Sequence, residues 1–496
     1  MHFSWKQERR FCCYPFMKKI VVIGAGMSGL AAAALCIRRG HRVVLVEQNW
    51  MVGGCTATYW RKGHRFESGA TTLVGLGKNR PVGWLLEQLN LPPLQATRLH
   101  LPMQVHGLSG TPTLTRFENL EDWIQEAERV FGPKGQRKFW TRCFKLSQFV
   151  WNNALELHHF PPQSLSDVLQ AIPLFSMERV QHLPYAFQTV EQWMEKCGLG
   201  NHAVFRKFID EQLMISAQNT ANDVNLLFGS TALCYTNEPN HYLEGGMQQL
   251  SDVLKNWIEK NGGEIILRQP IQKLEIASKN ISVIGKNRTW EADHVISSIP
   301  LNNLVDLVPS EISESWKKKI QPLDQLSGAF TMGIAYQPHR DWECIHHQIH
   351  LDSPMPQTGA HSIFLSTHPA TDPRSDLENI RVGAVSMHVL QPHKKHIHSK
   401  EEVENEVFHR LEEADLIKRE NVVYFHSSTP GGWEAWTMRK NGMVGGYPQL
   451  KNVLPWQMPG CKLHGNRLLG AGDSFYPGQG IPGVILSAKA AVETLD

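Results

Sequence analysis

The chain has 496 residues, more than one compact core usually requires, and this length predicts two domains. Hydrophobic residues make up 42% and charged residues 20% of the sequence, as in ordinary globular proteins. A formal net charge of +3 without a dominant basic block gives no electrostatic reason to expect nucleic-acid binding. The nine cysteines contain no C-x-x-C pair, which indicates neither a disulfide framework nor a zinc site and favours reduced thiols in the cytoplasm.

Residues 1–17 carry charged and aromatic side chains but no long apolar run and no small-residue cleavage site. These features are unlike those of a signal peptide. We expect an extension with little order. Met17, directly before Lys-Lys-Ile, is an alternative start of the protein.

Residues 18–48 have the pattern of a strand, a glycine turn, a helix and a second strand. Within the turn, Gly24, Gly26 and Gly29 have the G-x-G-x-x-G spacing of a dinucleotide site. The first glycine permits a tight turn, the second a close approach of pyrophosphate, and the third close packing of helix on strand. Glu47 ends the second strand, where a carboxylate binds ribose hydroxyls and disfavours a 2′-phosphate. We therefore predict cofactor contacts from Gly24, Ala25, Gly26, Ser28, Gly29 and Glu47.

Two alternatives apply to this stretch. One is a glycine turn that binds no nucleotide. The other is a membrane span, because residues 20–37 are nearly free of charge and about long enough to cross a bilayer. The glycines at the centre of the run and the strand ending in Glu47 favour the soluble strand–helix–strand unit.

A glycine-dense stretch follows the second strand. We expect a loop here, whose backbone approaches a large ligand at Gly53 and Gly54. The small residues Gly69, Ala70 and Thr71 leave room for a flat ring system. An ordinary surface loop is the alternative.

The string GGCTATYWRKGHRFESGATTLVGL, residues 53–76, resembles a segment of the phytoene desaturase and carotene isomerase family. These FAD-dependent oxidoreductases belong to the amine-oxidase-like superfamily, and the bacterial carotenoid desaturases are the most similar in motif. The usual pattern has Asp where this chain has Glu67. The resemblance implies FAD as the cofactor, with the glycine pair beneath it.

Residues 76–241 are rich in helical patterns and predict a mainly helical cap without strand alternation. Its many Trp and Phe residues either line an apolar substrate tunnel or form the core of the cap. An amphipathic part of the cap is expected to rest on a membrane surface.

The chain then returns to the nucleotide domain. Residues 242–247 are expected to begin a helix that continues to Ile258, and strands are expected at residues 264–267 and 270–274. By resemblance, the backbone of Ile271 contacts the adenine.

The C-terminal block predicts a strand at residues 466–471 and a final helix over 484–495. Between them, Gly472, Asp473 and the string YPGQGIPG resemble the closing motif of the family. The resemblance implies that Asp473 bonds the ribityl chain of FAD. It also implies that the helix N-terminus at Gly480 and Ile481 faces the pyrimidine edge of the flavin. Free amides there stabilise the negative charge of reduced flavin.

Together these segments predict an α/β protein with a Rossmann-type FAD-binding domain. That domain is interleaved with an α+β substrate domain that has a helical cap. The FAD-binding domain is expected from residues 18–75, 242–300 and 419–496, and the substrate domain from residues 76–241 and 301–418.

Histidines are frequent between residues 339 and 398. His346, His347 and His350 could suggest a metal site, but their spacing does not suit a helical pair of ligands and no carboxylate stands at ligand spacing. We expect hydrogen-bonded or exposed histidines and no metal.

The sequence shows no convincing nucleophile, catalytic triad or pair of carboxylates, and we assign no catalytic residue. This absence suits hydride transfer from a polyene to a flavin, which needs little help from side chains. We predict FAD-dependent desaturation of a carotenoid, with a hydride passing to flavin N5; isomerisation remains open. The expected location is cytoplasmic, at the inner face of a membrane that supplies the polyene, with oxygen or a quinone as electron acceptor.

Two other functions remain open. A flavin amine oxidase would require an aromatic pair framing the flavin, for which Tyr447 and Tyr476 are candidates. A flavin-binding protein without turnover is the second.

Overall fold

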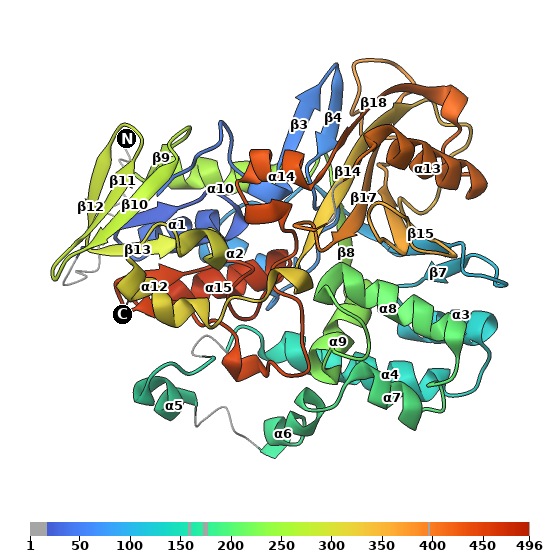
Figure 1. Ribbon diagram of the computed structural model, residues 1–496, viewed down its shortest axis with the longest axis horizontal. Coiled ribbons are helices and arrows are strands. Elements are labelled where there is room, and N and C mark those ends of the chain that lie inside the picture. Colours follow the sequence, from blue (N-terminus) through green and yellow to red (C-terminus); the bar gives the residue numbers. More distant parts are fainter. Residues whose placement is uncertain (1–16, 157–159, 172–176, 395–396, 496) are drawn as a thin grey trace, which may run out of the picture.

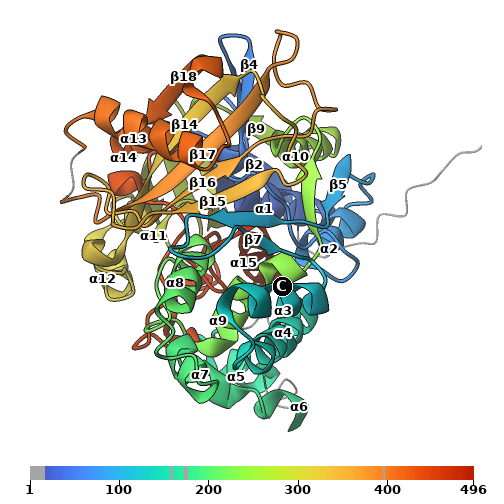
Figure 2. The same ribbon diagram turned by 90° about the vertical axis from the view of Figure 1, so that its right-hand side faces the viewer.

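The computed structural model describes residues 17–156, 160–171, 177–394 and 397–495 (Figure 1). The predicted N-terminal extension therefore lies outside the described residues, apart from Met17. Two large sheets and a layer of helices make up the protein, as Figure 2 shows from the side.

The first large sheet has six strands in the order β19-β20-β13-β1-β2-β9. Neighbouring strands are parallel except at the edge, where β19 is antiparallel to β20. The strands are β1 (Lys19–Ile23), β2 (Arg42–Val46), β9 (Glu264–Ile266), β13 (His294–Ser297), β19 (Lys462–His464) and β20 (Leu468–Gly470). They come from stretches far apart in the sequence, as expected for an interleaved fold.

Both faces of this sheet are covered, which explains the unbroken apolar run of β1. Ile20 and Val22 pack into one core with helices α1 (Met27–Arg38), α2 (Pro81–Gln88), α10 (Gln248–Lys260) and α15 (Ile481–Glu493). Val21 and Ile23 pack on the opposite face. The elements there are a three-stranded antiparallel sheet, β10 (Ile271–Ile276), β11 (Ile281–Gly285) and β12 (Thr289–Ala292), and two short helices, α11 (Leu301–Leu304) and α12 (Ser310–Lys317).

The second large sheet has seven strands in the order β18-β14-β17-β16-β15-β6-β7. They are β6 (Met103–His106), β7 (Leu114–Arg116), β14 (Ser327–Tyr336), β15 (His346–His350), β16 (Ser362–Ser366), β17 (Arg381–Leu390) and β18 (Val422–Ser428). One face packs against the apolar side of α13 (Lys400–Glu413) through Val403, Val407 and Leu411. The other face is turned toward the helical cap (Figures 1 and 2).

The cap is a layer of helices with its own aromatic core, built around Trp123, Trp140 and Phe205. Its helices are α3 (Leu120–Phe131), α4 (Gln136–Asn153), α5 (Leu165–Ala171), α6 (Met177–Val180), α7 (Val190–Lys196), α8 (Ala203–Ala217) and α9 (Leu226–Leu233). Among the described residues, no helix has both the length and the apolarity needed to cross a bilayer.

The cap region was predicted to lack strands, and this prediction was wrong. It contributes β6 and β7 to the large sheet, and β5 (Ala96–Leu99) pairs with β8 (Asn240–Leu243). These strands are three or four residues long, too short to show alternation, and their partners lie far along the chain.

Two boundaries also differ from the prediction. Tyr242 lies in β8, and the following helix, α10, begins only at Gln248, because Gly245 and Gly246 adopt positive φ angles between them. The expected glycine-dense loop contains a hairpin of β3 (Thr58–Arg61) and β4 (His64–Glu67). Its two-residue turn, Lys62-Gly63, has positive φ at both positions, which matches the twist of a hairpin. A further helix, α14 (Pro430–Thr437), precedes the C-terminal block.

Candidate functional site

A cavity of about 830 Å³ extends from the N-terminus of α1 into the space between the cap and the seven-stranded sheet. It brings together residues from both ends of the chain. Of the predicted cofactor residues, those that line it are Gly24, Gly26, Ser28, Glu47, Gly53, Gly54, Gly69, Ala70, Thr71, Ile271, Gly472, Asp473, Gly480 and Ile481.

The two remaining predicted residues, Ala25 and Gly29, lie behind the cavity wall. The backbone N–H of Ala25 donates to Glu47 Oε2 at 2.6 Å. A Cβ on Gly29 would lie 1.9 Å from the carbonyl oxygen of Gly24, so only glycine allows the helix to pack on the turn here. Ala25 and Gly29 therefore help to form the turn but do not face the cavity.

Gly26, at the start of α1, differs from Gly29 because no protein atom fills the space beside it. A Cβ built on Gly26 would have no protein atom within 4 Å, so the space beside it is open. The first amides of a helix are unpaired within the helix and carry partial positive charge. This opening therefore suits a pyrophosphate group.

The Glu47 carboxylate is held at the end of β2 by backbone amides. Oε2 accepts from Ala25 N, and Oε1 accepts from Asn49 N at 2.8 Å. Burial raises the pKa of Glu47, although hydrogen bonds from these amides oppose the change. Glu47 lines the cavity at the end of β2, the position from which a carboxylate can bind a ribose diol.

At the C-terminal side, Asp473 forms a partly buried ion pair with Arg439, Nη2 to Oδ2 at 2.6 Å. Arg439 Nε also donates to the carbonyl of Met443 at 2.9 Å, which fixes the guanidinium. A Cβ on Gly446 would lie 2.4 Å from the carbonyl oxygen of Asp473. No local pattern connects Arg439 with Asp473, so this ion pair was not predicted from the sequence.

The cavity also presents polar atoms that the protein leaves unused. Among the described residues, the buried indole N–H groups of Trp433 and Trp436 and the amide oxygen of Gln269 have no hydrogen-bond partner. All three side chains line the cavity. Such groups are costly to bury unless a ligand pairs with them. Together with the open α1 N-terminus, they fit a cofactor with phosphates, sugars and a base.

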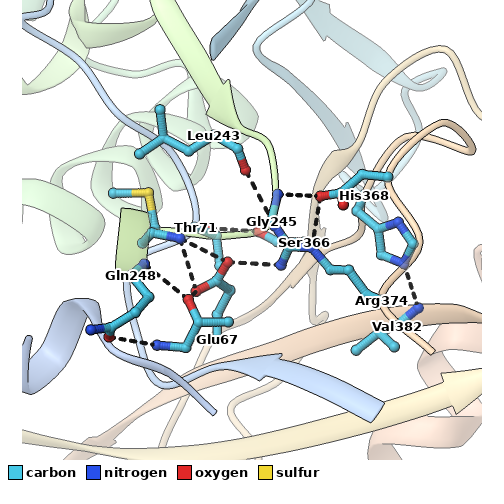
Figure 3. A network of polar contacts seen from close by, with 12 residues as sticks. Glu67, Thr71, Leu243, Gly245, Gln248, Ser366, His368, Arg374 and Val382 are labelled. Atoms are coloured by element: carbon cyan, nitrogen blue, oxygen red, sulfur yellow. Dashed lines mark hydrogen bonds and ion pairs between the residues drawn. The ribbon is translucent and has the colours of Figure 1, made fainter. Parts of the chain in front are cut away.

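A polar network holds the segment that carries Gly69, Ala70 and Thr71. Glu67 accepts from Thr58 Oγ1 at 2.7 Å and from Arg374 Nη1 at 2.7 Å. Figure 3 shows the guanidinium of Arg374 turned toward this carboxylate. The Arg374 Nε also donates to Asp372 at 3.2 Å, and Asp372 accepts from Gly245 N at 2.7 Å.

Thr71 continues this connection to the seven-stranded sheet. The hydroxyls of Thr71 and Ser366 lie 2.8 Å apart, and Ser366 Oγ is 2.8 Å from His346 Nδ1. Figure 3 shows Thr71 and Ser366 in the same group of contacts. The glycine-dense segment is therefore tied to the seven-stranded sheet.

Beyond this segment the cavity has a floor and a roof. One row of paired residues crosses the floor from β14 to β15 in the order Thr331, Ser386, Phe364 and Gln348. The roof comes from the cap helices α4, α8 and α9, through residues such as Val150, Met214, Ile215, Leu227 and Phe228. This half of the cavity is mainly apolar in its lining.

The two tyrosines considered as the aromatic pair of an amine oxidase, Tyr447 and Tyr476, do not both line the cavity. Tyr476 lines the cavity and packs against Phe160, with ring centroids 4.7 Å apart. Tyr447 lies in the core that contains Val21 and Ile23 of the six-stranded sheet, and its hydroxyl donates to Asn302. Tyr447 is not among the cavity-lining residues.

The three histidines considered for metal binding lie in β15 and are buried. Burial lowers the pKa of His346 to about 4 and those of His347 and His350 to about 3, so all three are neutral near pH 7. His347 Nδ1 is 3.1 Å from His106 Nε2. Within the described parts of the chain, no group of three potential ligands is arranged around a metal position.

Residues 27–495 match the family described as flavin containing amine oxidoreductase. The chain belongs to this family. Prolycopene isomerase 2, chloroplastic, from an Oncidium hybrid cultivar is 24% identical over 490 residues, covering 94% of this chain and 82% of the relative. The 4,4′-diapophytoene desaturase (4,4′-diaponeurosporene-forming) of Staphylococcus haemolyticus is 22% identical over 517 residues, covering 96% and 98%.

Solved structures agree with this assignment at the level of the fold. A putrescine oxidase structure superposes with a TM-score of 0.64 at 14% identity, covering 97% of this chain and 99% of that chain. These likenesses confirm the predicted α/β fold, the resemblance to carotene desaturases and isomerases, and FAD as the cofactor. The protein is an FAD-dependent oxidoreductase of the amine oxidoreductase family.

Proposed function

We propose that this oxidoreductase acts on a carotenoid polyene, which it desaturates or isomerises. The observation that carries the proposal is the continuity of the cavity. It leads from the turn at Gly24 and Gly26 past Thr71 into an apolar space between sheet and cap. A long hydrocarbon matches such a space because it offers almost nothing to hydrogen-bond.

The cofactor residues follow from the same geometry. We assign the pyrophosphate to the N-terminus of α1 at Gly26, the adenosine ribose to Glu47, and the adenine to the backbone of Ile271. The flavin end then lies between the Gly69–Thr71 segment and the N-terminus of α15 at Gly480. When bound, FAD supplies two-electron chemistry by accepting or returning a hydride.

The residues of the chain contribute orientation and water exclusion rather than acid–base chemistry. The middle of the floor is formed by Thr331, Ser386 and Phe364, whose side chains do not titrate near neutral pH. This composition suits a substrate whose reacting carbons need no protonated or charged partner. The curated relatives named above, an isomerase and a desaturase of carotenoids, support both forms of the reaction.

The amine oxidase alternative has weaker support. The putrescine oxidase structure shares the fold with this chain at only 14% identity, and Tyr447 does not line the cavity together with Tyr476. We further propose that the polyene is taken from a membrane surface and that oxygen or a quinone reoxidises the flavin.

The test is anaerobic mixing of FAD-loaded protein with acyclic carotenoids in liposomes, recording flavin and polyene absorbance together. Flavin bleaching matched by a red shift of the polyene indicates desaturation. A polyene change that requires prior reduction of the flavin indicates isomerisation. Unchanged spectra with every carotenoid, together with bleaching by a primary amine, would overturn the proposal in favour of an amine oxidase.

A further inference from the structure

A small group of polar side chains interrupts the apolar lining of the cavity where α8 meets β15 and β16. Its members are Glu211, Gln348 and Ser362, and all three line the cavity. Glu211 is only 9% exposed and Gln348 only 1% exposed. The roles assigned above to the flavin and the polyene make no use of this cluster.

Hydrogen bonds fix the cluster in place. Ser362 Oγ donates to Glu211 Oε2 at 2.5 Å, and Gln348 Nε2 donates to Ser362 Oγ at 3.2 Å. Gln348 Oε1 accepts from Gln212 Nε2 at 2.6 Å, and Gln212 in turn accepts from the buried Arg116 at 2.9 Å. The cluster is thus anchored in the core of the cap.

One atom of the cluster is left unused. Among the described residues, Glu211 Oε1 has no hydrogen-bond partner, although Oε2 is bound by Ser362. Glu211 is nine-tenths buried, yet this oxygen is not one of the fully enclosed unpaired atoms, so it faces the open space of the cavity. Because Glu211 lines the cavity, that oxygen is available to a donor group on a ligand.

The strand β16 sets the distance between this cluster and the flavin end of the cavity. Ser362, Phe364 and Ser366 lie on the same face of the strand, and all three line the cavity. Ser366 bonds Thr71 at one end, and Ser362 bonds Glu211 at the other. Four residues of strand correspond to about 13 Å. Between the two ends lies the apolar ring of Phe364.

We propose that Glu211, Ser362 and Gln348 bind a hydroxyl group at one end of an otherwise apolar substrate, about 13 Å along β16 from the contact between Ser366 and Thr71. This inference rests on the proposed function, because it specifies the class of polyene. The cluster would thereby determine both the choice of substrate and the position of the bond that reaches the flavin.

The charges around the cluster favour a hydroxyl over a charged group. A substrate carboxylate would be repelled by Glu211 and by Asp210, which lies close enough to influence its titration. These carboxylates would attract a substrate ammonium, but Lys207, which also acts on Glu211, offsets part of that attraction, and the ammonium would lose its hydration in an apolar cavity. Burial raises the pKa of Glu211 to about 7, so the group alternates between acceptor and donor near neutral pH. A hydroxyl, which both donates and accepts, matches either form.

The experiment compares three polyenes with the same skeleton: all-trans-retinol, its methyl ether and retinylamine. Their dissociation constants for the FAD-loaded protein are measured by quenching of tryptophan fluorescence. We expect retinol to bind at least about tenfold more tightly than the ether, as for one hydrogen bond to a carboxylate. In Glu211→Leu this preference should fall to about twofold or less, with the ether bound as well as in the wild type.

Two further variants make the result specific. Ser362→Ala removes the hydroxyl that orients Glu211 and should also reduce the preference for retinol. If Glu211→Leu no longer binds FAD, Ser362→Ala takes its place in the comparison. Asp210→Asn is the matched control. Asp210 neighbours Glu211 on α8, but its carboxylate accepts from Ala221 N and does not line the cavity. This variant should keep the wild-type preference.

Equal binding of retinol and ether by the wild type would overturn the inference. So would a preference that survives Glu211→Leu, tighter binding of retinylamine, or no binding of any of the three. The two experiments can fail independently of each other. A preference for retinol without any spectral change in the carotenoid experiment would contradict the proposed function but support the hydroxyl-binding site. Carotenoid turnover with equal binding of retinol and ether would leave only the proposed function.

Discussion

Glu67 and Arg374 form an ion pair at 2.7 Å although they are far apart in the sequence, and both side chains are 5% exposed. Glu67 ends the hairpin that precedes Gly69, whereas Arg374 lies in the loop between β16 and β17. The ion pair therefore ties the segment before Gly69 to the loop that connects β16 and β17 of the seven-stranded sheet (Figure 3).

Removing the arginine should be strongly destabilising. Arg374→Ala leaves the carboxylates of Glu67 and Asp372 buried without their cation, which typically costs about 3–5 kcal/mol. The matched control is Arg137→Ala, since the Arg137–Glu121 pair is 53% exposed on both sides and should contribute far less to stability than a buried pair. Thermal unfolding of the FAD-loaded protein measures both. Similar losses in the two variants would contradict the structural role of Arg374.

The glycines of the dinucleotide turn should separate folding from cofactor binding. In Gly26→Ala the added methyl group meets no protein atom within 4 Å, so the apoprotein should remain as stable as the wild type. Its FAD affinity should nevertheless fall by tenfold or more, because the methyl group occupies the space assigned to the pyrophosphate. Fluorescence titration with FAD and thermal unfolding of the apoprotein give the two values.

Gly29→Ala should behave in the opposite manner. Its methyl group would lie 1.9 Å from the Gly24 carbonyl oxygen, so the helix must shift and the apoprotein should lose about 3 kcal/mol of stability. If Gly26→Ala retained full FAD affinity, the placement of the pyrophosphate at this turn would be wrong.

The titration of Glu211 should be visible in the pH dependence of stability. Burial raises its pKa from the usual 4.5 to about 7, so the folded protein binds this proton more tightly than the unfolded chain. The contribution of Glu211 to stability is therefore lost as pH rises from about 4.5 through about 7, on the order of 3 kcal/mol in total. Glu211→Gln has no titrating carboxyl group at this position and avoids this loss. The Tm of the variant minus that of the wild type should therefore increase between pH 5.5 and pH 8. A Tm difference that does not change with pH would show that Glu211 titrates normally.

The floor of the cavity should limit the size of the substrate. Ser386 lies between Thr331 and Phe364 in the row that crosses the sheet. Ser386→Phe places a ring within the apolar half of the cavity, so FAD should be retained while the dissociation constant for a carotenoid rises tenfold or more. Thr289→Phe, at an exposed position of β12, is the control for adding a surface-accessible ring elsewhere. Unchanged carotenoid binding in Ser386→Phe would place the substrate elsewhere.

The sequence by itself determined the parts of this protein whose physical cause is local. The turn needs a positive φ angle at Gly24 and a close contact at Gly29, and glycine alone satisfies both. The same holds for the start of α15, where Gly480 has a φ of 83° before the helix. These two motifs were sufficient to predict the fold class and the cofactor, which the family match then confirmed.

Only the tertiary structure decided the features that depend on distant partners. The strands β5 and β6 exist because β8 and β15 supply their hydrogen bonds, and no residue pattern of three or four positions reveals such a partner. The Arg439–Asp473 pair and the Glu211–Ser362 contact arise in the same way. Burial by segments far along the chain also sets the pKa of Glu211, because desolvation depends on everything packed around a group rather than on its neighbours in sequence.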